Sequence, residues 1–121
     1  MQEKRDTIMA HIKIHNAEGT WTVRAGGAVL AETTNALELV EGDHAPVIYF
    51  PRADVAMAFL DVNQQTTKCP HKGHARYYNI ITKSQTLENA AWSYEDPNPG
   101  VASIKSHLAF HSSDTLTVER V

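Results

Sequence analysis

The sequence predicts a mainly β protein, a β-rich α+β fold formed as a single compact domain of antiparallel strands with one short C-terminal helix. Short segments in which apolar and polar residues alternate, the pattern of half-buried strands, recur along the chain. Turn-forming residues separate these segments, and only the stretch after Asn98 repeats apolar residues at helical spacing. A chain of 121 residues is long enough for one hydrophobic core.

We expect residues 1–9 to form a flexible tail and residues 10–121 to form the domain. The tail is charged and carries no apolar run behind it, so it does not read as a secretory signal. The first strand is expected within His11–His15, where Ile12 and Ile14 lie on one face.

A hairpin over Trp21–Ala31 is the clearest local prediction. Its turn is expected at Gly26–Gly27, because glycine readily takes the positive φ angles that a two-residue turn needs. This turn sets two pairs of residues opposite each other, Ala25 with Ala28 and Val23 with Leu30.

The later strands follow from apolar alternation and from β-forming residues. They are expected at Ala36–Val40, Val47–Phe50, Thr66–Lys68, Ala75–Thr82, Leu87–Tyr94 and Thr115–Glu119. A short helical turn is expected near Val55–Met57, and a polar turn at Asp61–Gln65.

The one helix is expected near the C-terminus. Asn98 can cap its first turn, and Pro99 suits the first helical position because the missing N–H would have no partner there. Val101, Ile104 and Leu108 then recur at helical spacing.

Composition restricts the class of function. A formal net charge of −3 argues against a nucleic-acid or membrane-surface partner, which would normally bring a basic excess. No apolar run approaches the roughly 20 residues needed to span a bilayer. A single cysteine cannot form an internal disulfide, which fits a cytoplasmic location.

Side chains capable of chemistry are densest around Cys69. Lys68 and Lys72 lie close to it in sequence, and nearby cations favour the thiolate, so Cys69 is a candidate nucleophile. The alternative is a small buried hydrophobe, since free cysteine is among the most buried residue types. Lys72 beside Gly73 could also hold an anion as a point charge.

A metal site is not predicted. Cys69, His71 and His74 offer three ligands, whereas a structural zinc site uses four, usually in two close pairs. His107 and His111 could present two histidines if the helix extended that far, but no glutamate follows His107 as in the metalloprotease motif. No particular cofactor is indicated.

Two further segments carry candidate ligand-binding residues. Arg52 and Asp54 follow the buried Val47–Phe50 run, at a strand end where polar groups can line a pocket. Trp92 and Tyr94 share a strand face, which suits stacking on a planar ligand, although core packing explains the same pattern.

These motifs resemble the family catalogued as domain of unknown function 427, which also carries a nucleotidyltransferase-like label. The similarity covers about residues 11 to 120 and includes the segments Val47–Val55, Thr67–Ala75 and Ala91–Pro97, in which the Cys-Pro-x-Lys-Gly and Trp-Ser-Tyr motifs are specific. Members often have an aromatic residue where this chain has His71. The resemblance implies a β-tent-like fold, similar to methionine sulfoxide reductase B and the cereblon ligand-binding domain, which bind small ligands in a sheet cavity. The two Cys-x-x-Cys pairs of the zinc-binding relatives are absent here.

We therefore predict a cytoplasmic domain that binds an unidentified small molecule. The candidate catalytic residues are Cys69 and Lys72, and the candidate ligand-binding residues are Tyr49, Arg52, Asp54, Tyr78, Trp92 and Tyr94. One alternative is a nucleotidyltransferase-like enzyme using Lys72, Arg52 and a magnesium ion held by carboxylates, for which the candidates are Asp54, Glu95 and Asp96. A second alternative is a protein interaction module. Neither the reaction nor the oligomeric state follows from the sequence.

Overall fold

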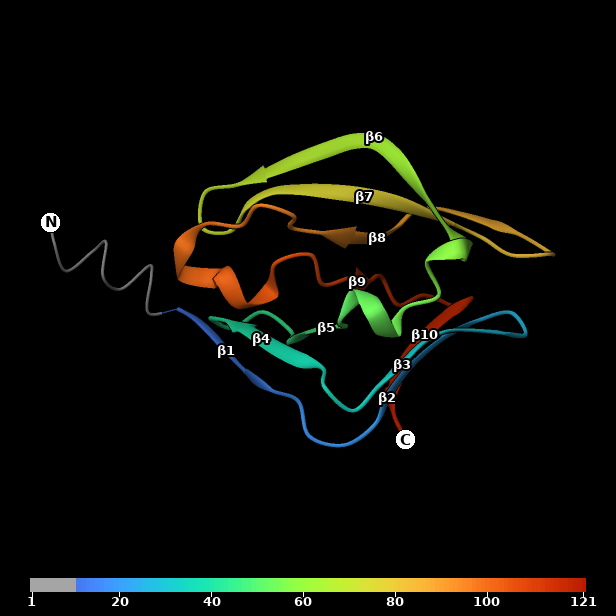
Figure 1. The fold of residues 1–121 in the computed structure, drawn as a ribbon, viewed down its shortest axis with the longest axis horizontal. Helices are drawn as coiled ribbons and strands as arrows, with labels where there is room; N and C mark the ends of the chain where they lie inside the picture. Colours follow the sequence, from blue (N-terminus) through green and yellow to red (C-terminus); the bar gives the residue numbers. More distant parts are fainter. Residues whose placement is uncertain (1–10) are drawn as a thin grey trace, which may run out of the picture.

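Three antiparallel sheets make up residues 11–121, the part of the chain that the computed structural model describes (Figure 1). The first sheet has the order β1-β4-β5, with β1 (Ile12–Asn16), β4 (Leu37–Glu41) and β5 (Val47–Tyr49). The second has the order β10-β2-β3, with β10 (Leu116–Arg120), β2 (Trp21–Ala25) and β3 (Ala28–Thr33). The third has the order β6-β7-β8-β9, with β6 (Leu60–Cys69), β7 (Gly73–Ile81), β8 (Thr86–Ser93) and β9 (Ala109–Phe110). The predicted tail at residues 1–9 lies outside the described residues.

The four-stranded third sheet lies above the two three-stranded sheets in Figure 1. Single bridges join the layers. Phe50 and Leu108 exchange backbone hydrogen bonds of 2.7 and 2.9 Å, which connects the end of β5 to the segment before β9. Ala31 in β3 bridges to Val55. Within the described residues, no helix is long and apolar enough to cross a membrane.

The core consists of two hydrophobic clusters. The first cluster combines residues of the second and third sheets and includes Leu30, Phe50 and Ile80, all completely buried. The second cluster lies against the first sheet and includes Tyr49 and Ile104. Tyr49 and Phe50 are neighbours in sequence yet belong to different clusters, because successive side chains of an extended chain point to opposite faces.

The structure confirms the mainly β prediction and most of the predicted strands. β1, β4, β5, β7, β8 and β10 coincide with predicted segments to within a few residues. Ile12 and Ile14 are half-buried while Lys13 and His15 are exposed, as the alternation predicted.

The hairpin of β2 and β3 has the predicted turn but a different register. Gly26 takes a φ of +61° in that turn. Val23 pairs with Ala31, not with Leu30 as predicted, because a β-bulge makes Leu30 an extra residue in β3. The bulge lets both Leu30 and Ala31 be buried.

The predicted polar turn at Asp61–Gln65 is wrong, because β6 continues through it. The strand is irregular between Val62 and Thr66, where two extra residues interrupt its pairing with β7. Amide side chains hydrogen-bond across this irregularity, with Asn63 Nδ2 donating to Asn79 Oδ1 at 3.0 Å. β6 is the edge of its sheet and pairs with β7 alone among the described strands.

The C-terminal helix is shorter than predicted and is a 3-10 helix, η3 (Pro99–Ile104), with a non-helical φ of −127° at Val101. Leu108, predicted on its apolar face, instead pairs with Phe50. Asn98 makes no side-chain cap. The helical turn predicted near Val55–Met57 is replaced by two 3-10 helices on either side of Val55, η1 (Arg52–Asp54) and η2 (Met57–Phe59).

Candidate functional site

The predicted site residues lie in separate places, and strand alternation explains the separation. In the segment from Trp92 to Glu95, Trp92 and Tyr94 line a pocket, whereas Ser93 and Glu95 hydrogen-bond to Arg52. Because consecutive residues of an extended segment face opposite sides, one motif supplies both sites.

The neighbouring strand β7 is divided in the same way. Tyr77 pairs across the sheet with Trp92 and lines the same pocket. Tyr78 belongs to the first core cluster, and its hydroxyl contacts Arg52. The two groups therefore lie on opposite faces of the β7–β8 strand pair.

The aromatic pocket is the hollow bounded by four aromatic side chains and one ion pair. It has a volume of about 360 Å³ and includes in its lining Glu41, Tyr49, Lys72, Tyr77, Trp92 and Tyr94. Trp92 Nε1 donates a hydrogen bond of 3.3 Å to the Tyr49 hydroxyl. The His111 ring lies against Trp92, with a centroid distance of 4.4 Å. These contacts hold the Trp92 ring in a fixed orientation at the wall of the pocket.

Burial sets the protonation of the two tyrosines beneath the pocket. Tyr49 is 1% exposed and Tyr94 is 6% exposed. In both cases desolvation raises the pKa of the phenol well above its ordinary value, because a buried phenolate is unfavourable. Both side chains are therefore neutral hydroxyl donors at physiological pH.

Lys72 and Glu41 form the charged part of the pocket. The Lys72 Nζ to Glu41 Oε1 distance is 2.6 Å, and the side chains are 13% and 25% exposed. The hydrogen bond from Lys72 lowers the pKa of Glu41. Burial alone would lower the pKa of Lys72, but the hydrogen bond to Glu41 and the negative charge of that carboxylate raise it overall. Lys72 thus carries its proton at neutral pH, and in this state it can bind an anion but has no free electron pair for attack.

The turn between β6 and β7 fixes the position of Lys72. Gly73 has a φ of +111°, and a Cβ there would lie 3.4 Å from the backbone oxygen of Asp96. Asn98 donates from its backbone N–H to Lys72 O and from its side chain to Pro70 O, both at 3.0 Å. The Cys-Pro-x-Lys-Gly motif therefore forms a tight turn attached to the segment that precedes η3.

Cys69 lies at the start of this turn and contributes to packing. Its free thiol is half-buried and packs against the second core cluster. It does not line the aromatic pocket. Its role as a nucleophile stays a prediction, alongside the alternative of a small buried hydrophobe.

Histidine and acidic side chains do not gather into a metal centre within residues 11–121, where no three His, Cys, Asp or Glu groups lie within reach of one ion. His107 and His111 do not share a helix face, because η3 ends at Ile104.

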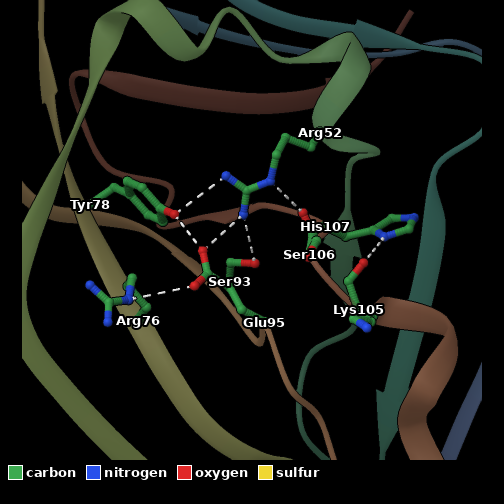
Figure 2. A network of polar contacts seen from close by, with 8 residues as sticks. All are labelled: Arg52, Arg76, Tyr78, Ser93, Glu95, Lys105, Ser106 and His107. Carbon is green, nitrogen blue, oxygen red and sulfur yellow. Dashed lines mark hydrogen bonds and ion pairs between the residues drawn. The ribbon is translucent and has the colours of Figure 1, made fainter.

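Arg52 is the centre of the second group of predicted residues, which we call the guanidinium network (Figure 2). Its Nε donates to the backbone oxygen of Ser106 at 3.1 Å. Its Nη1 donates to the Tyr78 hydroxyl at 3.4 Å. Its Nη2 donates to Ser93 Oγ at 3.4 Å and to Glu95 Oε2 at 3.2 Å. One guanidinium group thus links η1, β7, the end of β8 and the segment after η3.

Glu95 connects this network to a second arginine. Its Oε2 accepts a hydrogen bond of 2.8 Å from the Tyr78 hydroxyl, and its Oε1 lies 3.6 Å from Arg76 Nε. Burial raises the pKa of Tyr78, and its hydrogen bond to Glu95 adds to this rise against the opposing effect of Arg52. Tyr78 therefore stays protonated and donates to Glu95.

Asp54 belongs to neither site. It is exposed, and its Oδ2 accepts a hydrogen bond of 2.7 Å from Thr33 Oγ1 at the end of β3. This contact ties η1 to the second sheet, which agrees with a structural use of the aspartate.

Some residues of both sites were not among the predicted site residues. Glu41 lies 31 positions before Lys72, and no local pattern connects the two. Ser93 was not predicted, and Glu95 was predicted only as a carboxylate for the magnesium alternative. Both stand within a predicted motif, whose alternation was the available signal that they face away from Trp92.

Residues 11–121 thus form a small antiparallel β domain with an aromatic-lined hollow and a separate arginine-centred network. Residues 13–120 match the family described as a domain of unknown function, DUF427, and the chain belongs to this family. The match confirms the resemblance seen in the sequence motifs. A comparison with curated proteins found no match.

Proposed function

We propose that the chain binds a small planar ligand in the aromatic pocket. The observation that carries this proposal is the convergence of four aromatic side chains on a largely buried ion pair, Lys72 with Glu41. The volume of about 360 Å³ falls within the roughly 300–1,000 Å³ usual for small-molecule sites.

The lining indicates the chemistry of the ligand. Faces and edges of Tyr77 and Trp92 suit an unsaturated ring. Lys72 offers a cation to an anionic or acceptor group, and Glu41 offers an acceptor to an N–H or O–H group beside it. A heterocycle with both a donor and an acceptor on one edge satisfies the pair without leaving either charge unpaired.

Fluorescence of Trp92 tests this proposal directly. The variant Trp21→Phe leaves Trp92 as the one tryptophan, since the chain has two. Nitrogen heterocycles, nucleosides and nucleotides, with and without magnesium, are titrated against it, and the melting temperature is followed in parallel. A bound ligand is expected to quench Trp92 and to raise the melting temperature.

A matched pair of lysine variants locates the binding. Lys72→Met should weaken the ligand about tenfold or more, because it removes a charge-assisted contact. Lys68→Met, an exposed lysine of the same hairpin, should leave affinity unchanged. Unchanged affinity in Lys72→Met would contradict the proposal. A lack of response to every compound would also contradict it and would favour an interaction module.

Nucleotidyl transfer is not proposed as a second function. That alternative needs Lys72 and Arg52 around one phosphate chain, whereas Lys72 pairs with Glu41 in the aromatic pocket and Arg52 pairs with Glu95 in the guanidinium network. Stabilisation by a nucleotide only in the presence of magnesium would reopen it.

A further inference from the structure

We infer that the guanidinium network is a second binding site, which takes a tetrahedral oxyanion such as a phosphate group, with Glu95 occupying the anion's place when the site is empty. This inference does not depend on the aromatic pocket, because the two sites share no residue.

Hydrogen-bond donors outnumber acceptors in the network. Arg52 and Arg76 bring two positive charges and ten N–H groups by their chemistry, and Tyr78 and Ser93 add two hydroxyls. Glu95 is the carboxylate that both guanidinium groups share. An excess of donors around one carboxylate is the arrangement that recognises an oxyanion.

The pairing of Glu95 is loose. Its distances to Arg52 Nη2 and Arg76 Nε are 3.2 and 3.6 Å, longer than the roughly 2.7–2.9 Å of strong charge-assisted hydrogen bonds. For comparison, Lys72 and Glu41 lie 2.6 Å apart. Each arginine contacts one oxygen, although a guanidinium group binds carboxylates and phosphates best through two parallel hydrogen bonds. Glu95 therefore occupies the position of the anion but forms only long ion pairs with the two arginines.

Arg52 is oriented independently of any anion. Its Nε is fixed on the backbone oxygen of Ser106, a residue with a φ of +60° that a side-chain-bearing residue rarely adopts. The guanidinium carbon lies 5.8 Å from the centre of the Tyr78 ring. Ser93 is completely buried and places its hydroxyl beside Nη2. Before a ligand arrives, Nη1 is thus directed at the Tyr78 hydroxyl and Nη2 at Ser93 and the Glu95 carboxylate.

Solvent reaches the network, so an anion can enter. The side chains of Arg52, Arg76 and Glu95 are 33%, 45% and 43% exposed. A hollow of about 190 Å³ adjoins Arg76 and Glu95, and Asp96 also lines it. No ion pair joins Asp96 to either arginine in the described part of the chain. Glu95 follows the end of β8 and its side chain is partly exposed, so turning it toward solvent breaks only its contacts with Tyr78, Arg52 and Arg76.

Calorimetric titration of inorganic phosphate into the intact chain tests the inference, with chloride at matched ionic strength as the control. Glu95→Gln should bind phosphate about tenfold more tightly than the unmodified chain, because it removes a like charge from the site. Arg52→Met should abolish binding, and Arg52→Lys should weaken it because a lysine cannot form two parallel hydrogen bonds. Lys72→Met should leave phosphate affinity unchanged.

Three results would overturn the inference. They are phosphate heats no larger than those of chloride in Glu95→Gln, a loss of binding in Lys72→Met with none in Arg52→Met, and weaker binding in Glu95→Gln than in the unmodified chain. Circular dichroism checks that each variant is folded. Should Arg52→Met unfold, Arg52→Lys and Glu95→Gln decide the question. If Lys72→Met loses heterocycle binding but keeps phosphate binding, this site is distinct from the proposed pocket.

Discussion

The aromatic pocket and the guanidinium network both take residues from the segments Val47–Val55 and Ala91–Pro97 and from β7, but their charges are held differently. In the pocket, Lys72 and Glu41 are 13% and 25% exposed and 2.6 Å apart. In the network, Arg52 and Glu95 are 33% and 43% exposed and 3.2 Å apart. A sequence motif that lies along a β-strand therefore does not correspond to a single site, because its alternate residues point to opposite faces of the sheet.

The two ion pairs should also differ in how much they contribute to the free energy of unfolding. A largely buried ion pair is costly to break, because the remaining charge is left without compensation. An exposed pair contributes roughly 0–1 kcal/mol. The pocket should therefore depend on its ion pair for stability, and the network should not. The following variants test this contrast, starting with the largest expected effect.

Removing a buried side chain from each site should give unequal losses. Tyr49→Ala should lower the free energy of unfolding by about 3–5 kcal/mol, as other large-to-small core substitutions of aromatic residues do. Ser93→Ala should cost about 1 kcal/mol or less, because it removes one hydroxyl and leaves the volume nearly unchanged. Both residues are at most 1% exposed, so burial is matched. Urea denaturation measures both values, and equal losses would contradict the expectation that packing of Tyr49 supports the fold more than the Ser93 hydroxyl does.

Breaking the two ion pairs should also give unequal losses. Lys72→Met should cost about 2 kcal/mol, below the value for a fully buried pair because some solvent reaches Glu41. Adding Glu41→Gln should recover part of this loss. Glu95→Gln, which breaks the Arg52–Glu95 pair and keeps the other hydrogen bonds of Arg52, should cost less than about 1 kcal/mol. Should urea denaturation at neutral pH rank Glu95→Gln as the more costly change, the contrast between the sites is wrong.

The smallest effect concerns pH. Desolvation lowers the pKa of His111 below its ordinary value of 6.5. The unfolded chain then takes up this proton more readily than the folded one, so folding stability falls as pH drops from 6.5 toward the folded pKa. His111→Gln should reduce the loss of stability between about pH 7 and pH 5.5. The measurement is the melting temperature at both pH values, and an unchanged or steeper decline would exclude this contribution.

Strands could be predicted from the sequence because their signal is local. The alternation around Ile12 and the β-forming run of β7 were sufficient without knowledge of their partners. The failures occurred where distant contacts decided the structure. Leu108 stands at helical spacing but pairs with Phe50, and Asp61–Gln65 is polar but extends along β7.

The candidate site was predictable only in part for the same reason. Tyr49, Lys72, Trp92 and Tyr94 come together as the sequence suggested. Arg52 does not join them, because the chain turns at η1 and directs its guanidinium group to the other face of β8. Its contact with Ser106 spans 54 positions, a separation at which no sequence pattern operates.

The irregularity in β6 has a consequence for the behaviour of the protein at high concentration. A ten-residue strand at a sheet edge exposes unpaired backbone groups on which a strand from another molecule can add. Between Val62 and Thr66 the extra residues distort this edge, and its side chains there are mostly polar. The distortion leaves no long regular segment for pairing, so we expect it to disfavour edge-to-edge association of β6 with another molecule.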